Sequence, residues 1–359
     1  MAKAIAEQVI VITGASSGIG LATAQEAARR GAKVVLAARN AQDLEHAVQE
    51  IRREGGDALA VPTDVSVYEQ VEQLATRATE TYGRIDTWIN NAAVAAYAEF
   101  MQLSLDDFRR IMDVNFMGQV YGARAALPHL ERSEGTLICV GSTLSDRGIP
   151  LQGAYCASKH ALKGWLDSLR IELRKGGSKV RVTLVKPSSV NTPLFNKAKT
   201  QIGVMPQPIA PIYQPELGVE ALLHAATTNE RELFVGGGGK LLSTAERISP
   251  KLVDIWERRE GFDGQMTDWP KSQDAPNNLY KPVEYDGGVR GDFVAEEKHR
   301  STYQSLERHV RVASLTAAAA LATGAFFARR ARGNGVVIAA LAAAAAALTG
   351  KAVLANFEG

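Results

Sequence analysis

The stretch that decides the fold is VIVITGASSGIG, residues 9–20. Its first five residues are β-branched, which predicts a buried strand, and glycines follow at positions 14, 18 and 20. Glycine allows a tight turn and lets backbone N–H groups at a helix start approach a pyrophosphate. A glycine trio alone could also be a strand-to-helix turn without a ligand. Because this one follows a predicted strand and opens a predicted helix, it predicts a dinucleotide-binding loop.

The alternation of strand and helix patterns continues to about residue 236. Segments of helical length and periodicity lie at 19–30, 41–54, 67–82 and 104–131. The further strand-like runs are KVVLAA (33–38), ALAV (58–61), IDTWIN (85–90), TLICVG (136–141), VRVTLV (180–185) and LFVGG (233–237). Repetition of strand then helix is typical of a parallel sheet covered by helices on both faces.

Composition limits the class of protein. The 359 residues allow one main domain and an appendage, and 46% hydrophobic with 22% charged residues is ordinary for a folded globular chain. The formal charge of +2 provides no field that would recruit nucleic acid. Cys139 and Cys156 are too few for a disulfide framework and lack metal-ligand spacing, so no metal site is predicted. With an N-terminus unlike a secretory signal, this indicates a cytoplasmic protein.

Three segments depart from the alternation. Residues 187–215 contain several prolines and little periodicity, which predicts a functional loop over the carboxyl ends of the strands, here called the lid. We therefore expect a catalytic domain at 1–242 that includes the lid, a mostly irregular polar arm at 243–311, and an alanine-rich helical hairpin at 312–359.

The alanine-rich tail contains two uncharged runs, 312–328 and 333–350, separated by the basic residues RRAR. Each run is near the lower length limit for crossing a bilayer, and alanine is only weakly hydrophobic. Two interpretations stay open: membrane contact through 312–350, or an antiparallel helix pair that packs on a partner subunit.

The residues after the second and third strands bear on the choice of dinucleotide. Arg39 follows the second strand, where the adenosine ribose is expected, and its guanidinium suits a 2′-phosphate. This favours NADP over NAD, although Arg39 could be a solvated arginine at a strand end. Asp64 and Val65, after the third strand, are predicted to contact adenine, and Asp64 could alternatively cap a helix.

Five motifs occur in one order: TGASSGIG at 13–20, NNAA at 90–93, DVNFMG at 113–118, VGST at 140–143 and YCASK at 155–159. With them the chain resembles the short-chain dehydrogenase/reductases over roughly residues 7–237. The resemblance implies a three-layer, doubly wound Rossmann fold with a seven-stranded parallel sheet, to which the arm and tail add a C-terminal helical extension. The sequence departs from the family at Ala93 and Ser188, where glycine is usual.

The resemblance implies NAD(P)(H) as cofactor and a catalytic group of Tyr155, Lys159, Ser142 and Asn115. Within it, Ser142 would hydrogen-bond the substrate oxygen, and Asn115 would hold a water that relays protons. The alternatives without a catalytic role are that Ser142 forms a turn and that Asn115 is a buried amide whose hydrogen bonds are made to backbone groups. The predicted cofactor contacts are Gly14, Ser16, Ser17, Gly18, Ile19, Gly20, Arg39, Asp64, Val65, Asn90, Asn91, Ala92, Tyr155, Lys159, Pro187, Val190 and Thr192.

Tyr155 and Lys159 are four residues apart and share one face of a predicted helix. A phenol with a pKa near 10 exchanges protons poorly at neutral pH, and one positive charge at about 4 Å supplies roughly the free energy that lowers this pKa by 2–3 units. We therefore expect the Lys159 ammonium to lower the pKa of Tyr155. The alternative is one amphipathic helix face without chemistry.

These features predict an NADP(H)-dependent oxidoreductase that interconverts an alcohol and a ketone or aldehyde, with Tyr155 as general acid and base. Apolar residues in the lid favour a lipid-like or steroid-like substrate. Two alternatives remain open: a non-catalytic dinucleotide-binding scaffold or sensor, and an epimerase without net redox change. The family resemblance also implies a homo-oligomer, dimeric or tetrameric.

Overall fold

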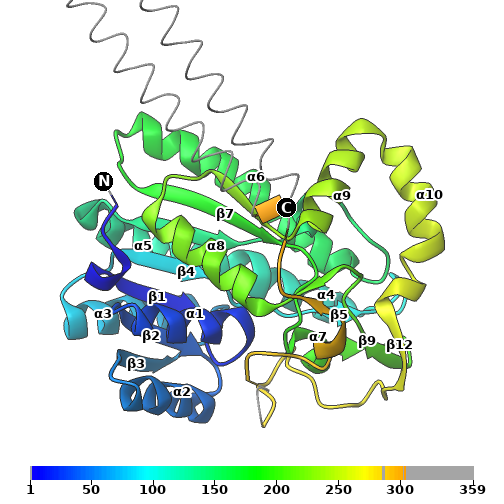
Figure 1. Cartoon of the computed structure of the whole chain (residues 1–359), viewed down its shortest axis with the longest axis horizontal. Helices are drawn as coiled ribbons and strands as arrows, with labels where there is room; N and C mark the ends of the chain where they lie inside the picture. The colour runs from blue at the N-terminus through cyan, green and yellow to red at the C-terminus, as the bar shows by residue number, and fades with distance from the viewer. Residues whose placement is uncertain (1, 285–287, 302, 305–359) are drawn as a thin grey trace, which may run out of the picture. The chain divides into compact units, whose positions relative to one another are not determined.

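A parallel sheet of seven strands lies at the centre of the fold (Figure 1). The strands follow the order β11–β7–β6–β4–β1–β2–β3, and every neighbouring pair is parallel. Their bounds are Val9–Thr13 (β1), Lys33–Ala38 (β2), Asp57–Pro62 (β3), Thr87–Asn90 (β4), Thr136–Val140 (β6), Arg181–Pro187 (β7) and Glu232–Val235 (β11). This confirms the predicted α/β fold with its seven-stranded sheet.

The strand order reverses between β1 and β4. After β1 the chain adds β2 and β3 on one side, and it then returns to place β4 on the other side. The loops that leave the carboxyl ends of β1 and β4 therefore run in opposite directions and open a crevice, which is where doubly wound sheets bind ligands. The computed structural model describes residues 2–284, 288–301, 303 and 304.

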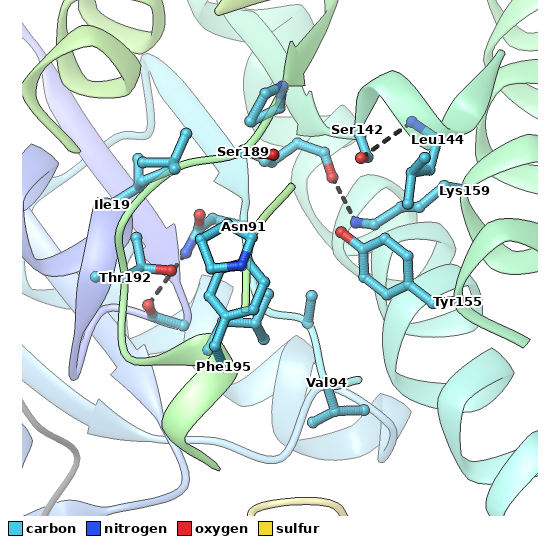
Figure 2. Close-up of a pocket in the computed structure, with 18 of the residues that line it drawn as sticks. Ile19, Asn91, Val94, Ser142, Leu144, Tyr155, Lys159, Ser189, Thr192 and Phe195 are labelled. Carbon is cyan, nitrogen blue, oxygen red and sulfur yellow. Dashed lines mark hydrogen bonds between the residues drawn. The ribbon is translucent and has the colours of Figure 1, made fainter. Parts of the chain in front are cut away.

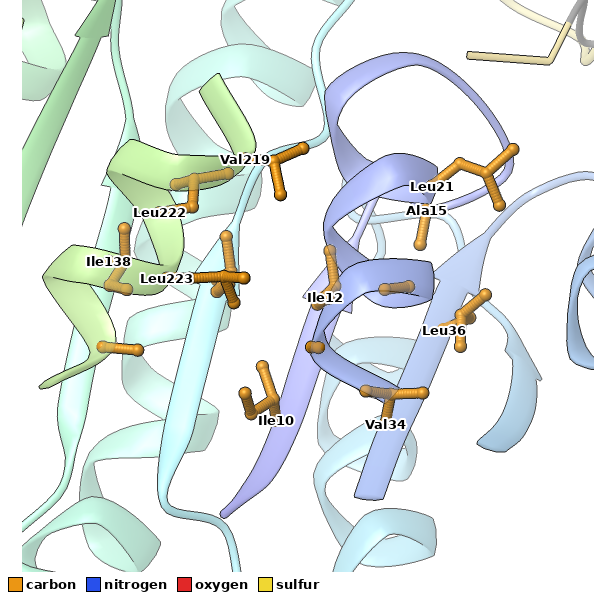
Figure 3. Close-up of a cluster of buried hydrophobic side chains, with 14 of the residues drawn as sticks. Ile10, Ile12, Ala15, Leu21, Val34, Leu36, Ile138, Val219, Leu222 and Leu223 are labelled. Atoms are coloured by element: carbon orange, nitrogen blue, oxygen red, sulfur yellow. The ribbon is translucent and has the colours of Figure 1, made fainter. Parts of the chain in front are cut away.

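Helices cover both faces of the sheet, because successive side chains of a strand point to opposite sides. On one face, Ile10 and Ile12 of β1 pack against α1 (Gly18–Arg29), α2 (Ala41–Arg53) and α8 (Pro215–Thr227). Figure 3 shows this cluster, with Leu222 and Leu223 of α8 facing the strands. On the other face, Val11 packs with α3 (Tyr68–Tyr82), α5 (Gly118–Ser133) and α6 (Gly153–Lys175). These are the three layers that were predicted.

The segment predicted as one helix at 104–131 consists of three parts. Helix α4 (Leu105–Met112) continues into a π-helical segment, η2 (Asp113–Met117), and then into α5. Single π-helical turns inside α-helices occur often at functional sites. Here the π turn contains Asn115, one of the predicted catalytic residues.

The lid forms short secondary structure that the sequence pattern did not indicate. It contains α7 (Leu194–Lys197), β8 (Lys199–Thr200), β9 (Val204–Pro206) and β10 (Ile212–Tyr213). Strand β8 pairs with β5 (Ala96–Tyr97), while β9 and β10 pair with strands of the C-terminal arm. These ladders hold the lid over the carboxyl ends of the sheet strands.

The arm also differs from the irregular surface segment that was expected. It begins with α9 (Gly237–Ile248), which spans the expected boundary at residue 242, and continues through α10 (Pro250–Glu260), η4 (Asp263–Gln265), β12 (Met266–Pro270), η5 (Val294–Glu296) and β13 (Glu297–Lys298). Residues 1–301 form one compact unit. Leu279 and Phe293 are buried at 0% and 4% exposure within clusters formed by the catalytic region. Isolated apolar residues of this kind produce no periodic pattern, so the sequence did not reveal the packing.

The alanine-rich tail, including both apolar runs at 312–328 and 333–350, lies outside the described residues. Within the part of the chain that the structure describes, no helix combines the length and the apolar character needed to cross a membrane. Membrane contact through the tail therefore stays a prediction.

Candidate active site

A cavity of about 340 Å³ opens at the carboxyl ends of the sheet strands, in the crevice between β1 and β4. The glycine loop and the end of β2 line one part of it. Tyr155 and Lys159 of α6 line another part, and the lid closes over both. The loop, the strand ends and the Tyr–Lys pair that the motifs predicted therefore share one continuous space.

The glycine loop is shaped by backbone geometry and by one clamping side chain. Gly14 has φ of +66°, a conformation that favours glycine. A Cβ on Gly20 would overlap the carbonyl oxygen of Gly14, so glycine is also needed where α1 approaches β1. The Asn91 side-chain amide donates to the carbonyl oxygens of Thr13 and Gly14 at 3.0 and 3.1 Å. Ser16, Ser17, Gly18 and Ile19 then border the cavity.

The opposite end of this space contains the residues predicted to hold adenosine. Arg39, Asp64 and Val65 all line the cavity. The Arg39 guanidinium donates to the backbone carbonyl of Asn278 in the arm. Asp64 accepts hydrogen bonds from the Ser66 backbone and hydroxyl at 3.0 and 2.7 Å, and it pairs with Arg110 at 2.9 Å. Burial opposes ionisation of Asp64, but these partners outweigh it and lower the pKa of its carboxyl group.

Gly20, Asn90 and Asn115 do not line the cavity. The Asn90 side chain is buried, donates to the carbonyl of Gln119 at 3.0 Å and accepts from the Trp88 indole at 2.8 Å. Asn90 therefore connects β4 to α5 and supports the loop that begins at Asn91. The other predicted contacts, including Ala92, Pro187, Val190 and Thr192, do line the cavity.

Asn115 is fully buried in the π turn, and other parts of the protein satisfy its side chain. Its oxygen accepts from the Val94 amide at 2.8 Å, while its nitrogen donates to the Val94 carbonyl at 2.9 Å and to the Ser158 hydroxyl at 3.3 Å. Asn115 thus connects the loop after β4 to α6, and its contact on α6, Ser158, directly precedes Lys159. This arrangement matches the structural alternative for Asn115, in which a buried amide makes its hydrogen bonds mainly to backbone groups.

Tyr155, Lys159 and Ser142 converge on the cavity. In Figure 2 the Tyr155 hydroxyl and the Lys159 amine lie on the same side of the pocket, opposite Asn91 and Thr192. The Lys159 nitrogen is 5.4 Å from the centre of the Tyr155 ring and donates to the carbonyl of Val140 at 2.9 Å. The Ser142 hydroxyl accepts a hydrogen bond from the Leu144 amide at 3.1 Å and lines the cavity together with Tyr155. One turn of α6 and the end of β6 therefore present three polar groups together.

The electrostatics of the pair differ from the sequence-based expectation. Burial raises the pKa of Tyr155 well above its usual value, and the neighbouring Ser142 hydroxyl opposes this shift. Lys159 is 1% exposed, and burial lowers its pKa to about 8. The expectation that Lys159 would bring the Tyr155 pKa below 10 is therefore wrong for this structure. The physical reason is that removal from water is the largest contribution to the pKa of each group.

A buried charge cluster holds the turn that contains Ser142. Asp146 directly follows this turn and accepts hydrogen bonds from Lys186 at 3.1 Å, from Ser243 at 2.7 Å and from Lys163. Burial alone would raise the pKa of Asp146, but these partners lower it to about 2. The cluster connects the turn to α6, β7 and α9, and it was missed because its members are far apart in sequence.

Other cavity residues also went unrecognised in the sequence. Lys197 of α7 donates to the Ser17 hydroxyl at 2.7 Å, which brings a basic side chain from the lid to the glycine loop. Trp256 and Glu257 of α10 line the cavity from the arm. None of these residues belongs to a motif or to a periodic pattern that includes the catalytic residues.

The fold and the site define an oxidoreductase of the short chain dehydrogenase family, and the chain belongs to that family. The family model described as short chain dehydrogenase matches residues 8–203. This confirms the resemblance drawn from the motifs. The family binds NAD(P), and the glycine loop, the ends of β1 and β2 and the space between them fit such a dinucleotide.

Individual relatives agree with this assignment. The chain is 41% identical over 281 residues to the uncharacterized oxidoreductase YxnA of Bacillus subtilis (strain 168), covering 77% of this chain and 79% of that protein. It is 30% identical over 260 residues to estradiol 17-beta-dehydrogenase 11 of Rattus norvegicus, covering 72% and 85%. A solved alcohol dehydrogenase from Thermococcus sibiricus, complexed with 5-hydroxy-NADP, superposes with a TM-score of 0.56 at 29% identity, covering 63% of this chain and 95% of that one.

Proposed function

We propose that this protein is an NADP(H)-dependent alcohol dehydrogenase or carbonyl reductase in which Tyr155 is the general acid and base. The observation that carries the proposal is the group formed by Tyr155, Ser142 and Lys159 in one cavity with the glycine loop. A protein that only bound dinucleotide would gain nothing from a buried lysine beside a phenol.

The chain's own residues supply the proton chemistry. The dinucleotide, when bound, supplies or accepts the hydride. In reduction, Ser142 donates a hydrogen bond to the substrate oxygen and stabilises the negative charge that develops there. Tyr155 then transfers its hydroxyl proton to that oxygen, and the Lys159 ammonium stabilises the phenolate that remains. Oxidation of the alcohol reverses these steps. Asn115 acts at a distance by holding the segment of α6 next to Lys159.

Preference for NADP rests on Arg39. Its guanidinium lies at the cavity end of β2, where a 2′-phosphate would be paired by a charge-assisted hydrogen bond. Lys197 adds a second cation near the glycine loop. The bound NADP derivative of the Thermococcus sibiricus enzyme supports the same choice.

An apolar substrate is favoured by the apolar side chains that line the cavity. Among them are Tyr97, Ile149, Phe195, Pro208, Ile209, Leu242 and Trp256. A lipid-like or steroid-like alcohol or ketone would bury its body against them. The name of the estradiol dehydrogenase relative is consistent with this substrate class.

The test measures NADPH absorbance while the full chain turns over a panel of apolar ketones and aldehydes. Tyr155→Phe should lower kcat by about a thousandfold, because the proton donor is lost while the ring still fills its place. Equal turnover by Tyr155→Phe would overturn the proposal. Substrate conversion without net NADPH consumption would instead indicate an epimerase, and dinucleotide binding without any conversion would indicate a scaffold.

A further inference from the structure

One side chain in the cavity has no role in the reaction described above. Glu257 lies on α10 of the arm, lines the same cavity as Tyr155, and is 4% exposed. Among the residues that the structure describes, neither of its carboxylate oxygens has a hydrogen-bond partner. A buried carboxylate without partners is costly, so an unsatisfied one in a ligand cavity calls for an explanation.

The charged neighbours of Glu257 do not satisfy it. Arg147 attracts its charge, but the Arg147 guanidinium pairs with Glu246 at 3.0 Å and with Asp254 at 2.6 Å. The Cys156 thiol is the other titratable group that senses Glu257, and it is buried on α6. Burial raises the pKa of the Glu257 carboxyl to about 7, with Arg147 opposing, so the carboxylate form is present at neutral pH but is poorly solvated.

The surroundings of Glu257 in the cavity are apolar or already engaged. Trp256, Leu242 and Ile209 present apolar surfaces. The two amide side chains on this wall have partners, since Gln152 donates to Gln265 at 2.7 Å and Gln207 donates to the carbonyl of Met266 at 3.0 Å. The amide nitrogens of Gln152 and Gln207 are thus engaged, whereas both carboxylate oxygens of Glu257 lack a partner among the described residues, so Glu257 is the stronger, charged acceptor for a ligand here.

We propose that Glu257 accepts a hydrogen bond from a hydroxyl or ammonium group that the substrate carries in addition to its reacting oxygen. The substrate is thus an apolar molecule with two polar points. Ser142 and Tyr155 hold its reacting oxygen, and Glu257 holds its second, donating group. The identity of the reacting oxygen rests on the proposed function, whereas the contact with Glu257 is a matter of binding alone.

The experiment measures binding without turnover. Trp256 is adjacent to Glu257 and lines the cavity, so its fluorescence in the full chain reports ligand binding. The cofactor site is saturated with 1,4,5,6-tetrahydro-NADP, which neither donates nor accepts a hydride, so that neither the ketone nor an ω-hydroxyl group is turned over. The probes are heptan-2-one, decan-2-one and tridecan-2-one, each compared with its ω-hydroxy and ω-amino derivative. Because the three ketones differ in chain length, the series places the second polar group at three distances from the carbonyl oxygen, and one of these should suit Glu257.

At the best chain length, the wild-type protein should bind a donor-bearing ketone about 10- to 100-fold more tightly than the plain ketone, as expected for a hydrogen bond to a charged group. Glu257→Leu should reduce this ratio to about one. Glu257→Gln should keep part of the gain for the hydroxyl and lose it for the ammonium, which distinguishes the two donors. The matched control is Glu260→Leu, an exposed position on the same helix outside the cavity, which should leave the ratio unchanged.

Two results would overturn the inference: no gain in affinity from a donor at any chain length, or the same gain in Glu257→Leu as in the wild type. Thermal unfolding checks the folded state of each variant, and Glu257→Leu should be at least as stable as the wild type because an unpaired buried carboxylate is removed. A large loss of stability with an unchanged affinity ratio would assign Glu257 a structural role. Failure of the proposed function would appear separately, as full turnover by Tyr155→Phe.

Discussion

The glycine loop and the C-terminal arm meet at the same cavity, but the sequence encodes them in different ways. The loop is a contiguous motif in which residue type and spacing carry the function. The arm reaches the loop through its backbone: the Gly18 amide donates to the carbonyl of Gly288 at 2.8 Å, and the Asn40 side chain donates to the carbonyl of Val283 at 3.2 Å. Arg39 likewise contacts the Asn278 carbonyl.

A backbone carbonyl belongs to every residue type, so contacts of this kind leave no signature in the sequence. The difference suggests that the two regions have different roles. The motif-bearing region provides the reaction and the dinucleotide site, while the arm stabilises that site and shapes the substrate side of the cavity. This comparison can be tested by changing each region separately, and the largest effect is expected at Lys159.

Lys159→Met should lower kcat/KM for ketone reduction by about a thousandfold, because the phenolate formed in the reaction loses its neighbouring charge. Lys175→Met, an exposed lysine at the end of α6, is the control and should leave the rate unchanged. Steady-state kinetics with NADPH measures both variants. A rate for Lys159→Met within a few-fold of the wild type would remove the lysine from the mechanism.

The pH profile of the wild-type enzyme gives a second test of the same residue. Burial lowers the pKa of Lys159 from 10.5 to about 8, so its positive charge is lost as the pH rises through about 8. The value of kcat/KM for reduction should therefore fall above this pH, and the fall should be absent in Lys159→Met. A flat profile between pH 7 and about 9.5 would contradict the assigned charge state.

Leu279→Ala tests the arm. This leucine is completely buried against Val65, Val94 and Ile111, so the cavity left by truncation should lower the free energy of unfolding by about 2–4 kcal/mol. Leu252→Ala, at a position 67% exposed in α10, should change stability little. Thermal or urea unfolding measures both. If Leu279→Ala matches the control, the arm does not pack on the site as described.

Arg39→Gln tests the predicted cofactor preference at the boundary between the two regions. Loss of the guanidinium should raise KM for NADPH by about 10- to 100-fold and change KM for NADH little, because the 2′-phosphate is the group that distinguishes the cofactors. Kinetics with both cofactors measures the ratio. An unchanged ratio would mean that Arg39 serves only to hold the arm through the Asn278 carbonyl.

Asp146→Asn should have the smallest effect. The wild-type carboxyl has its pKa lowered from 3.8 to about 2, so its stabilising contribution is present above pH 3.8 and is lost as the pH falls through about 2. The variant should be less stable than the wild type by about 1–2 kcal/mol at neutral pH, and the difference should shrink in acid. Asp106→Asn, at an exposed side chain, is the control for acid unfolding. A stability difference that is independent of pH would assign the effect to packing.

The sequence by itself determined the fold and the chemical identity of the site. Alternating strand and helix patterns specified the parallel sheet. The three glycines lie close together in the loop after β1, and Tyr155 and Lys159 lie one turn apart on α6. Local spacing was therefore enough to place each group. The order of the motifs then identified the family, which the comparisons confirmed.

The tertiary structure alone decided how the arm meets the cavity, which residues satisfy Asn115, and in which direction the pKa of Tyr155 moves. Each of these depends on burial or on contacts between segments far apart in the chain. Glu257 shows the reason most clearly. In the sequence it is one more charged residue of a polar helix, and only the packing of α10 against the catalytic region turns it into a buried carboxylate that lines the cavity. Burial changes the free energy of a charge by several kcal/mol, and it is a property of the whole fold rather than of any local pattern.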